Sequence, residues 1–526
     1  MAAITVPTQH GVASGRVTVS VYTLSPMTAD STLPEEIDVL IAGAGNAACC
    51  AALSAREVGL SVLVCERAPE AQSGGNSRYT AGAMRVVYNS VDDLRQLMPE
   101  LTDEECANAD FGCYSREDFF DDMARITQYR CDPTLTDLLV ENSFNTLSWM
   151  QDKGVRFMPM YARQAFRIDG RFRFWGGLTV EAWGGGPGLV EQLHKALNRE
   201  NISLVYDCRV HAVNTNPEGV SSVDVIYQGQ PRTVRTRSVV LACGGFEANR
   251  MWRTRYLGPG WELAKVRGTR YNTGDGIRMG LAAGAGSAGH WSGCHAVGWD
   301  ANAPEFGDLN VGDGYQKHSY PFGIMVNARG DRFVDEGADF RNYTYARYGR
   351  EILAQPGQFA WQVFDRQVTH LLRDEYRIRE VSKVQAESLP ALAEKLEGVD
   401  PEGFLETVRQ FNAAVQQDVP FDPTVKDERG TSGLTLNKTH WANPLTEPPF
   451  VAYQITCGIT FTFGGLKIDE HARVLDESDQ PIPGLHAAGE MVGGLFYFNY
   501  PGGTGLTSGA VFGRIAGRSA AAKVTA

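Results

Sequence analysis

The chain has 526 residues, of which 43% are hydrophobic and 21% are charged, as is usual for soluble proteins, and its net charge is −13. This length predicts two domains, or one large domain that another interrupts. The acidic balance, with a pI near 5.4, argues against nucleic acid or an anionic membrane surface as the main partner. The ten cysteines form no C-x-x-C pair, which predicts free thiols and no metal site.

Residues 1–35 are predicted to be a flexible N-terminal leader, because they are polar and weakly patterned. They lack the apolar region of a signal peptide and any span of roughly 20 apolar residues, so no integral membrane segment is expected. The sequence predicts a cytoplasmic protein. A mitochondrial address stays open, since the leader up to Ala29 has one arginine and no acidic residue.

The stretch that follows the leader has the pattern of a dinucleotide-binding unit. A buried parallel strand is predicted over residues 37–42, a helix over 46–58 and a second strand over 61–65. Between the first strand and the helix lies a G-x-G-x-x-A turn, whose small residues let backbone N–H groups approach a pyrophosphate. Glu66 ends the second strand, where an acidic side chain can bind a ribose. The unit therefore predicts a binding site for NAD or FAD.

The loop over residues 73–82 distinguishes FAD from NAD, because it is glycine-rich and polar where an NAD domain would continue into a helix. It resembles the second flavin motif of the fumarate reductase and succinate dehydrogenase flavoprotein superfamily. In the covalent members of that superfamily a histidine in this loop bonds the flavin. Here the loop has no histidine, so the resemblance implies that FAD is bound non-covalently.

Further motifs of the superfamily follow in order along the chain. They comprise an apolar strand that ends in a glycine pair, a T-G-D-G turn, an A-G-E segment whose glutamate would bind the ribityl chain, and a glycine-rich segment that opens the last helix. The resemblance implies that FAD is bound by Gly43, Gly45, Asn46, Ala47, Glu66, Arg67, Gly74, Gly75, Asn76, Ser77, Thr80, Gly82, Val210, Ala242, Gly244, Asp275, Gly489, Glu490, Gly505 and Leu506.

The same resemblance implies the fold class and the domains. The fold would be α/β, with a Rossmann-like FAD-binding domain of the glutathione-reductase type that an α+β capping domain interrupts. The FAD-binding domain would comprise residues 36–286 and 446–526, and the capping domain residues 287–445. Closure of the capping domain would exclude water and position the substrate.

A cluster of arginines falls between two expected elements, within eleven residues of a chain that is otherwise acidic. Two interpretations are open. The cluster is a solvated β-hairpin that turns at Asp169-Gly170, or it is a cationic wall that binds a polycarboxylate. Its members are Arg163, Arg167, Arg171 and Arg173.

Three residues occupy the positions at which the superfamily has its active site. His295 lies where the family has a substrate histidine, Arg341 where it has its proton-transferring arginine, and Tyr500 where fumarate reductases keep an arginine. Phe461 replaces another family histidine, which argues against a fumarate or succinate enzyme. Arg341 is expected to transfer the proton, His295 to bind a carboxylate and Tyr500 to donate a hydrogen bond or share the acid–base role. From the residues alone, an ordinary buried histidine with its hydrogen bonds satisfied is the favoured interpretation of His295.

These departures look most like the tricarballylate dehydrogenase branch of the superfamily. The first hypothesis is therefore an FAD-dependent dehydrogenase that forms a C=C bond next to a carboxylate, by hydride transfer to flavin N5, on a small polycarboxylate such as tricarballylate. The second is a desaturase or ene-reductase of a ketone, because the Tyr-Pro-Gly-Gly segment also resembles 3-ketosteroid Δ1-dehydrogenases. The third is a flavoprotein subunit without turnover. An enzyme of this kind would also need an electron acceptor, which the sequence does not identify.

Overall fold

The computed structural model describes residues 33–525, and the residues from Pro34 on form one compact unit. Nearly all of the expected leader lies outside the described residues. All ten cysteines lie within them and are free thiols, as predicted. Among the described helices, none combines the length and the apolar character that crossing a membrane requires.

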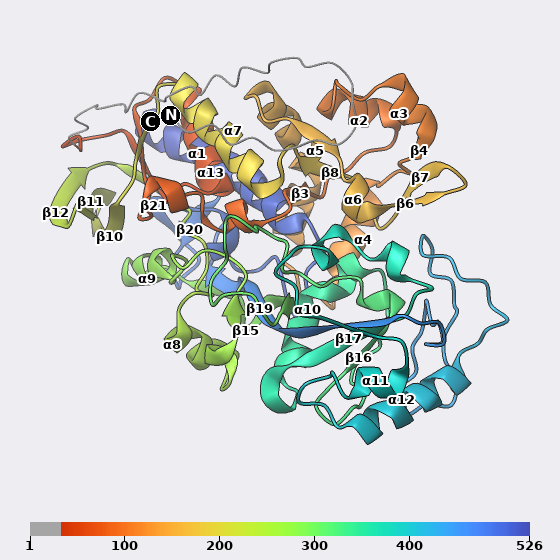
Figure 1. The fold of residues 1–526 in the computed structure, drawn as a ribbon. Coiled ribbons are helices and arrows are strands. Elements are labelled where there is room, and N and C mark those ends of the chain that lie inside the picture. Colours follow the sequence, from red (N-terminus) through yellow and green to blue (C-terminus); the bar gives the residue numbers. More distant parts are fainter. Residues whose placement is uncertain (1–32, 526) are drawn as a thin grey trace, which may run out of the picture. The chain divides into compact units, whose positions relative to one another are not determined.

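A six-stranded sheet carries the dinucleotide-binding unit (Figure 1). Its central strand β1 (Val39–Ala42) is fully buried and pairs in parallel with its neighbours on both sides, as expected for an apolar strand that helices cover on both faces. This sheet confirms the predicted Rossmann-like fold. Its strand order is β20 (Arg473–Leu475), β21 (Pro481–Ala487), β13 (Ser238–Leu241), β1, β2 (Val62–Cys65) and β9 (Ser203–Val205).

Two helices from opposite ends of the described chain pack side by side against this sheet. Helix α1 (Asn46–Arg56) follows β1, and α13 (Thr504–Thr525) ends the chain (Figure 1). Glycines allow the close approach: a Cβ on Gly513 would lie 2.4 Å from the Ala47 carbonyl oxygen, and one on Gly517 would lie 2.2 Å from that of Ala51. This packing brings the N-termini of both helices to the same place.

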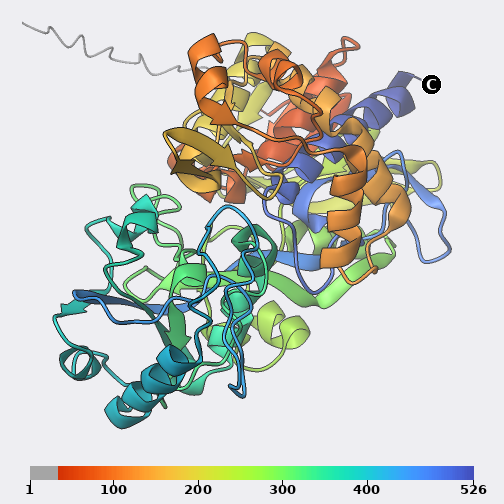
Figure 2. The ribbon, with the colours of Figure 1, turned by 90° about the vertical axis from the view of Figure 1, so that its right-hand side faces the viewer.

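The middle of the chain builds a second six-stranded sheet around one long antiparallel pair, β15 (Ser287–Asp300) and β19 (Phe450–Leu466). Figure 2 shows the blue β19 running through the green and teal part of the ribbon. The sheet thus joins strands from both sides of the expected boundary at residue 445, and the domain boundaries stay a prediction. Its other members are β14 (Lys265–Val266), β16 (Ile324–Val326), β17 (Ala360–Phe364) and β18 (Lys383–Ala386).

Helices of the middle segment cover this second sheet. Phe404, Val408 and Phe411 of α12 pack with Ile324 and Val363 of the sheet in one hydrophobic core. Since these side chains recur at three- and four-residue spacing, α12 presents one apolar face to the strands. The helices of this segment are α10 (Arg341–Leu353), α11 (Leu389–Ala393) and α12 (Pro401–Ala414).

Three small antiparallel or mixed sheets complete the fold: β3 (Ala83–Met84) with β5 (Phe157–Pro159) and β8 (Val180–Ala182), β4 (Ala109–Asp110) with β6 (Ala165–Ile168) and β7 (Arg171–Phe174), and β10 (Cys208–Asn216) with β11 (Gly219–Tyr227) and β12 (Gln230–Arg235). The remaining helices are α2 (Val91–Leu97), α3 (Asp103–Asn108), α4 (Arg116–Ile126), α5 (Pro133–Asp152), α6 (Tyr161–Gln164), α7 (Gly185–Arg199), α8 (Arg250–Trp252) and α9 (Asp275–Ala282).

Candidate functional site

One cavity connects the carboxyl ends of β1 and β2 with β15 and α10. All three predicted catalytic residues line it, and so do all predicted cofactor-binding residues except Gly74 and Gly82. Those two glycines pack against α7, behind the residues that line the cavity. A Cβ on Gly74 would lie 2.6 Å from the Val190 side chain, and one on Gly82 would lie 2.7 Å from the Gly185 backbone, so they let the glycine-rich loop lie against α7.

The dinucleotide end of the cavity is built from the turn between β1 and α1. Glu66, at the end of β2, accepts hydrogen bonds from the backbone N–H groups of Ala44 at 2.9 Å and Ala68 at 2.8 Å. Burial raises the pKa of the Glu66 carboxyl. Gly43 has φ +105°, and a Cβ there would lie 2.4 Å from the Ala242 carbonyl oxygen, so only glycine fits the turn. The acidic side chain therefore lies beside the glycine turn, as a ribose-binding residue requires.

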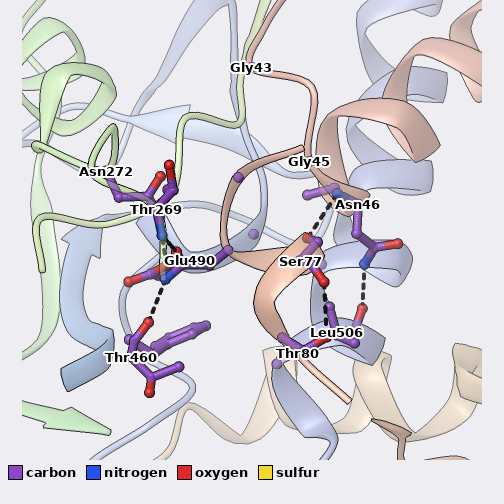
Figure 3. A pocket seen from close by; sticks show the side chains of 18 of the residues that line it. Gly43, Gly45, Asn46, Ser77, Thr80, Thr269, Asn272, Thr460, Glu490 and Leu506 are labelled. Atoms are coloured by element: carbon purple, nitrogen blue, oxygen red, sulfur yellow. Dashed lines mark hydrogen bonds between the residues drawn. The ribbon is translucent and has the colours of Figure 1, made fainter. Parts of the chain in front are cut away.

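The glycine-rich loop is anchored by hydrogen bonds that Figure 3 shows in part. The Asn76 side chain donates to Glu247 at 2.6 Å and to the Thr460 carbonyl oxygen at 2.7 Å. The Ser77 hydroxyl accepts from the Asn46 backbone N–H at 3.1 Å, and the Asn46 side chain donates to the Leu506 carbonyl oxygen at 2.7 Å (Figure 3). Asn46 thus joins the N-terminus of α1 to that of α13.

Two buried carboxyl groups lie together at the middle of the cavity, and of these Glu490 lines it whereas Glu247 does not. Glu490 accepts a hydrogen bond from the Thr462 backbone N–H at 2.8 Å, and Glu247 accepts one from the Asn272 side chain at 2.7 Å. Burial raises the pKa of Glu490 to about 7. It also raises the pKa of Glu247 well above its ordinary value, and the neighbouring Glu490 adds to that shift. The pair therefore holds a proton near neutral pH.

These features fit the predicted FAD. The cavity is continuous from the ribose acceptor Glu66 to the N-terminus of α13, where Gly505 and Leu506 line it. Gly43, Gly45 and Gly505 line it without side chains that would fill the cavity. The N-termini of α1 and α13 both open onto it, so their dipoles favour negative charge there. A pyrophosphate and the pyrimidine edge of a flavin are the groups that such positions suit.

The reaction end of the cavity is aromatic. His295, on β15, stacks on Tyr500 with ring centroids 4.7 Å apart, and the Tyr345 ring of α10 meets its edge at 4.9 Å. The Tyr500 hydroxyl accepts a hydrogen bond from the Gly505 backbone N–H at 3.2 Å. Burial raises the pKa of Tyr500 and lowers that of His295 well below its ordinary value, with Arg267 adding to the second effect. Both groups are neutral at pH 7.

Arg341 begins α10 and is also buried. One of its terminal nitrogens donates to the Arg163 carbonyl oxygen at 2.8 Å and to the Gln164 side chain at 2.6 Å. Its Nε atom has no hydrogen-bond partner among the described residues. Burial lowers the pKa of Arg341, and the nearby carboxylate of Glu375 opposes that effect. Since the Nε–H is unsatisfied, it is available to a ligand.

Positive charge exceeds negative charge at this end. Asp313 pairs with Arg163 at 2.7 Å and with Arg267 at 2.6 Å, and Arg341 and Arg373 have no direct carboxylate partner within residues 33–525. Burial lowers the pKa of Arg373 well below its ordinary value, and Arg341 adds to the effect. Burial also raises the pKa of the Glu181 carboxyl to about 7, so this carboxyl is only partly ionised at neutral pH. Arg163, Arg267 and Arg341 line the cavity at this end against Asp313, whereas Arg373 and Glu375 lie near Arg341 but do not line it.

Of the four arginines in the cluster, one fits the cationic wall and three fit the solvated hairpin. Arg163 lines the cavity, whereas Arg167, Arg171 and Arg173 are exposed on the hairpin of β6 and β7. The hairpin turns where predicted, with positive φ at both Asp169 and Gly170. The cationic wall consists of Arg163 and Arg341, which the sequence singled out, and of Arg267, which the sequence reasoning missed. Arg267, Asp313 and Tyr345 lie in no recognised motif. Pairing of β14 with β19 brings Arg267 to the site, whereas Asp313 lies in a loop and Tyr345 on α10.

Comparisons with known proteins agree with this site. A family model described as FAD binding domain matches residues 38–506, which include every predicted cofactor-binding residue. The chain is 30% identical to the probable fumarate reductase Ifc3 of Shewanella frigidimarina (strain NCIMB 400), over 93% of this chain and 75% of that protein. It is 29% identical to a 3-oxosteroid 1-dehydrogenase of Mycolicibacterium smegmatis, over 56% of this chain and 54% of that protein.

Among solved structures, the open conformation of a flavocytochrome c3 fumarate reductase is similar to this chain with a TM-score of 0.69 and 26% identity. The match covers 94% of this chain and 79% of that one.

Proposed function

The chain belongs to the FAD binding domain family, within the fumarate reductase and succinate dehydrogenase flavoprotein superfamily, and on that basis we propose that it oxidises or reduces a carbon–carbon bond next to a carboxylate. It is an FAD-dependent oxidoreductase that acts on CH–CH groups. The substrate that we propose first is a small polycarboxylate such as tricarballylate, which dehydrogenation would convert to an aconitate.

The observation that carries the proposal is the excess of guanidinium groups at the reaction end of the cavity. Three arginines, Arg163, Arg267 and Arg341, line it there against the single carboxylate of Asp313, and Arg341 has no direct carboxylate partner among the described residues. An unpaired buried charge is costly, so this end favours a ligand that brings negative charge. A C–H bond next to a carboxylate is weakly acidic, and fixed cations stabilise the enolate charge that develops when its proton leaves.

Each residue at the reaction end has its own proposed role. FAD, when bound, supplies a hydride acceptor or donor at N5. Arg341 offers its free Nε–H to the substrate, and its lowered pKa favours its part in proton transfer. His295 is neutral and can donate one ring N–H to a substrate carboxylate. The Tyr500 hydroxyl already accepts from Gly505, so its own proton is free for a substrate oxygen.

A second candidate, a desaturase or ene-reductase of a ketone, is favoured by the aromatic wall around Tyr500. The ring centroids of Phe461 and Phe496 lie 6.0 and 5.1 Å from that of Tyr500. Such a wall suits an apolar ring, and the Tyr500 hydroxyl could donate a hydrogen bond that polarises a ketone oxygen. The unpaired arginines would then have no ligand charge to balance, which is why we rank this candidate second.

We further propose that residues 287–445 cap the site. They supply His295 and Arg341, whereas Tyr500 comes from the part expected to bind FAD. Joining the two groups in one cavity excludes water from the reacting bond.

The test is an anaerobic titration of the FAD-loaded protein with a panel of saturated polycarboxylates and ketones, with flavin absorbance as the readout. The same panel in unsaturated form is added to the chemically reduced protein. The proposal expects a carboxylate to bleach the oxidised flavin or to restore the absorbance of the reduced one. Turnover of ketones alone would favour the second candidate and exclude the first.

A further inference from the structure

Arg85 is a fully buried arginine that follows β3 and does not itself line the cavity. Its guanidinium lies between the rings of Tyr114 and Tyr343, at 5.0 and 5.2 Å from their centroids. Burying a charged group costs several kcal/mol unless ion pairs and hydrogen bonds offset it. The contacts that offset this cost connect Arg85 with the turn between Tyr500 and α13 and with helix α10.

The first set of contacts reaches the turn between Tyr500 and α13. The Arg85 Nε donates to the Gly502 carbonyl oxygen at 2.9 Å, and the Arg85 backbone N–H donates to that of Gly503 at 3.3 Å. On the other side of the same turn, the Gly502 backbone N–H donates to the Asn342 carbonyl oxygen of α10 at 2.8 Å. The turn is therefore held between Arg85 and the first turn of α10.

The second set of contacts reaches α10 directly. A terminal nitrogen of Arg85 donates to the Tyr343 hydroxyl at 3.3 Å and lies 3.5 Å from a carboxylate oxygen of Asp122. The Tyr343 hydroxyl donates to Asp122 at 2.5 Å. Because Tyr343 lies two residues after Arg341, these bonds also fix the beginning of α10.

We propose that Arg85 is a positioning residue, which holds the N-terminus of α13 and Tyr500 in register with Arg341. The proposal rests on the proposed function of the same site. The planar guanidinium is required because its fork serves Gly502 and Tyr343 at once, whereas a lysine ammonium is a point charge on a flexible stem. Displacing the turn would weaken the positive helix end at Gly505 and Leu506.

The test compares Arg85→Lys with Arg253→Lys in the FAD-loaded protein. Arg253 is a matched control, because it is equally buried, donates to the carbonyl oxygens of Ala264 and Glu262, and does not line the cavity. The main readout is the affinity for sulfite, which adds to oxidised flavin at N5 and leaves negative charge on the ring. We expect Arg85→Lys to keep its FAD, to bind sulfite roughly 10- to 100-fold more weakly and to lose kcat by a similar factor, with KM little changed.

Arg253→Lys should bind sulfite as the wild type does, even if it unfolds at a lower temperature. Wild-type sulfite affinity in Arg85→Lys, or an equal loss in Arg253→Lys, would overturn the proposal. If Arg85→Lys does not fold, Tyr343→Phe removes the hydroxyl that Arg85 binds and should weaken sulfite binding in the same direction; wild-type affinity there would also overturn it. Sulfite binding needs no substrate, so its outcome is separate from failure of the proposed function.

Discussion

The imidazole ring of His295 stacks on the phenol ring of Tyr500, with centroids 4.7 Å apart and planes inclined by 20°. The two residues come from β15 and from the turn before α13, which are far apart in the sequence. His295 Nε2 has no hydrogen-bond partner among the described residues, and the Tyr500 hydroxyl accepts from the Gly505 N–H and lies within reach of the Tyr345 side chain. A substrate next to this pair would be bound by two neutral donors beside an excess of positive charge.

The first prediction concerns the cofactor. Because the loop that contains Asn76 and Ser77 has no histidine, FAD should be released when the protein is denatured. Precipitation with acid should leave free FAD in the supernatant, measured by its fluorescence. Flavin that stays on the washed precipitate would show a covalent bond and contradict the prediction.

The second prediction concerns proton transfer. Arg341→Lys should bind FAD but reduce it at least about a hundredfold more slowly in a single turnover, because a lysine places its charge and protons differently. Arg347→Lys is the control, since Arg347 is exposed on the same helix. Tyr500→Phe should lose less if its hydroxyl only orients the substrate. If Arg341→Lys reacted at nearly the wild-type rate while Tyr500→Phe did not, Tyr500 would be the proton-transfer residue.

Local sequence signals were sufficient for the cofactor end of the cavity. Glu66 follows a strand and a glycine turn that lie within about 30 residues of it, so one βαβ unit predicts its place. The exposed arginines of β7 were harder to interpret. In the run Arg171-Phe172-Arg173-Phe174 the strand alternates, so the phenylalanines pack on Tyr161 and Phe111 while the arginines face outward.

The remaining site residues could not be predicted, because long-range pairing places them. Arg267 reaches the cavity because β14 pairs with β19 beside Ile459, and no local motif marks that register. Asp313 lies in a loop and is recognisable only by the two arginines that it binds. The position of such residues depends on the register of β19, which no short stretch of the sequence reveals.

The third prediction concerns the shared carboxylate. Asp313→Asn should release Arg163 and Arg267 from their ion pairs and lower the free energy of unfolding, by up to roughly 3–5 kcal/mol, because buried cations are left unpaired. Citrate should restore part of the melting temperature by binding those cations, and less so at high salt. Asp331→Asn is the control, since its pair with Arg329 is exposed and should matter little. A melting temperature of Asp313→Asn that does not respond to citrate would contradict the anion site.

The fourth prediction concerns pH. Burial raises the pKa of Glu490 to about 7 in the folded protein, above the ordinary value of about 4.5, so the folded state binds the proton more tightly than the unfolded state. Its contribution to stability is complete below the ordinary pKa and is lost as the pH rises through about 7. Unfolding of the FAD-free protein by urea should therefore become easier between pH 5 and pH 8, by at most about 1.4 kcal/mol per pH unit from this group.

Glu490→Gln should flatten that dependence, whereas Glu477→Gln, at an exposed position, should leave it unchanged. Equal slopes in all three proteins would show that the Glu490 carboxyl does not carry the effect.

The most direct measurement of the central claim compares a carboxylate with its neutral amide of the same shape. Tricarballylate and its triamide are each mixed anaerobically with the oxidised, FAD-loaded protein, and the rate of flavin bleaching is recorded. The unpaired Arg341 beside Arg163 and Arg267 predicts rapid bleaching by the acid, at least about a hundredfold faster than by the amide, since charged hydrogen bonds are lost in the amide. Bleaching of equal rate by both compounds, or by a neutral ketone but by neither of them, would contradict a site built for a carbon–carbon bond next to a carboxylate.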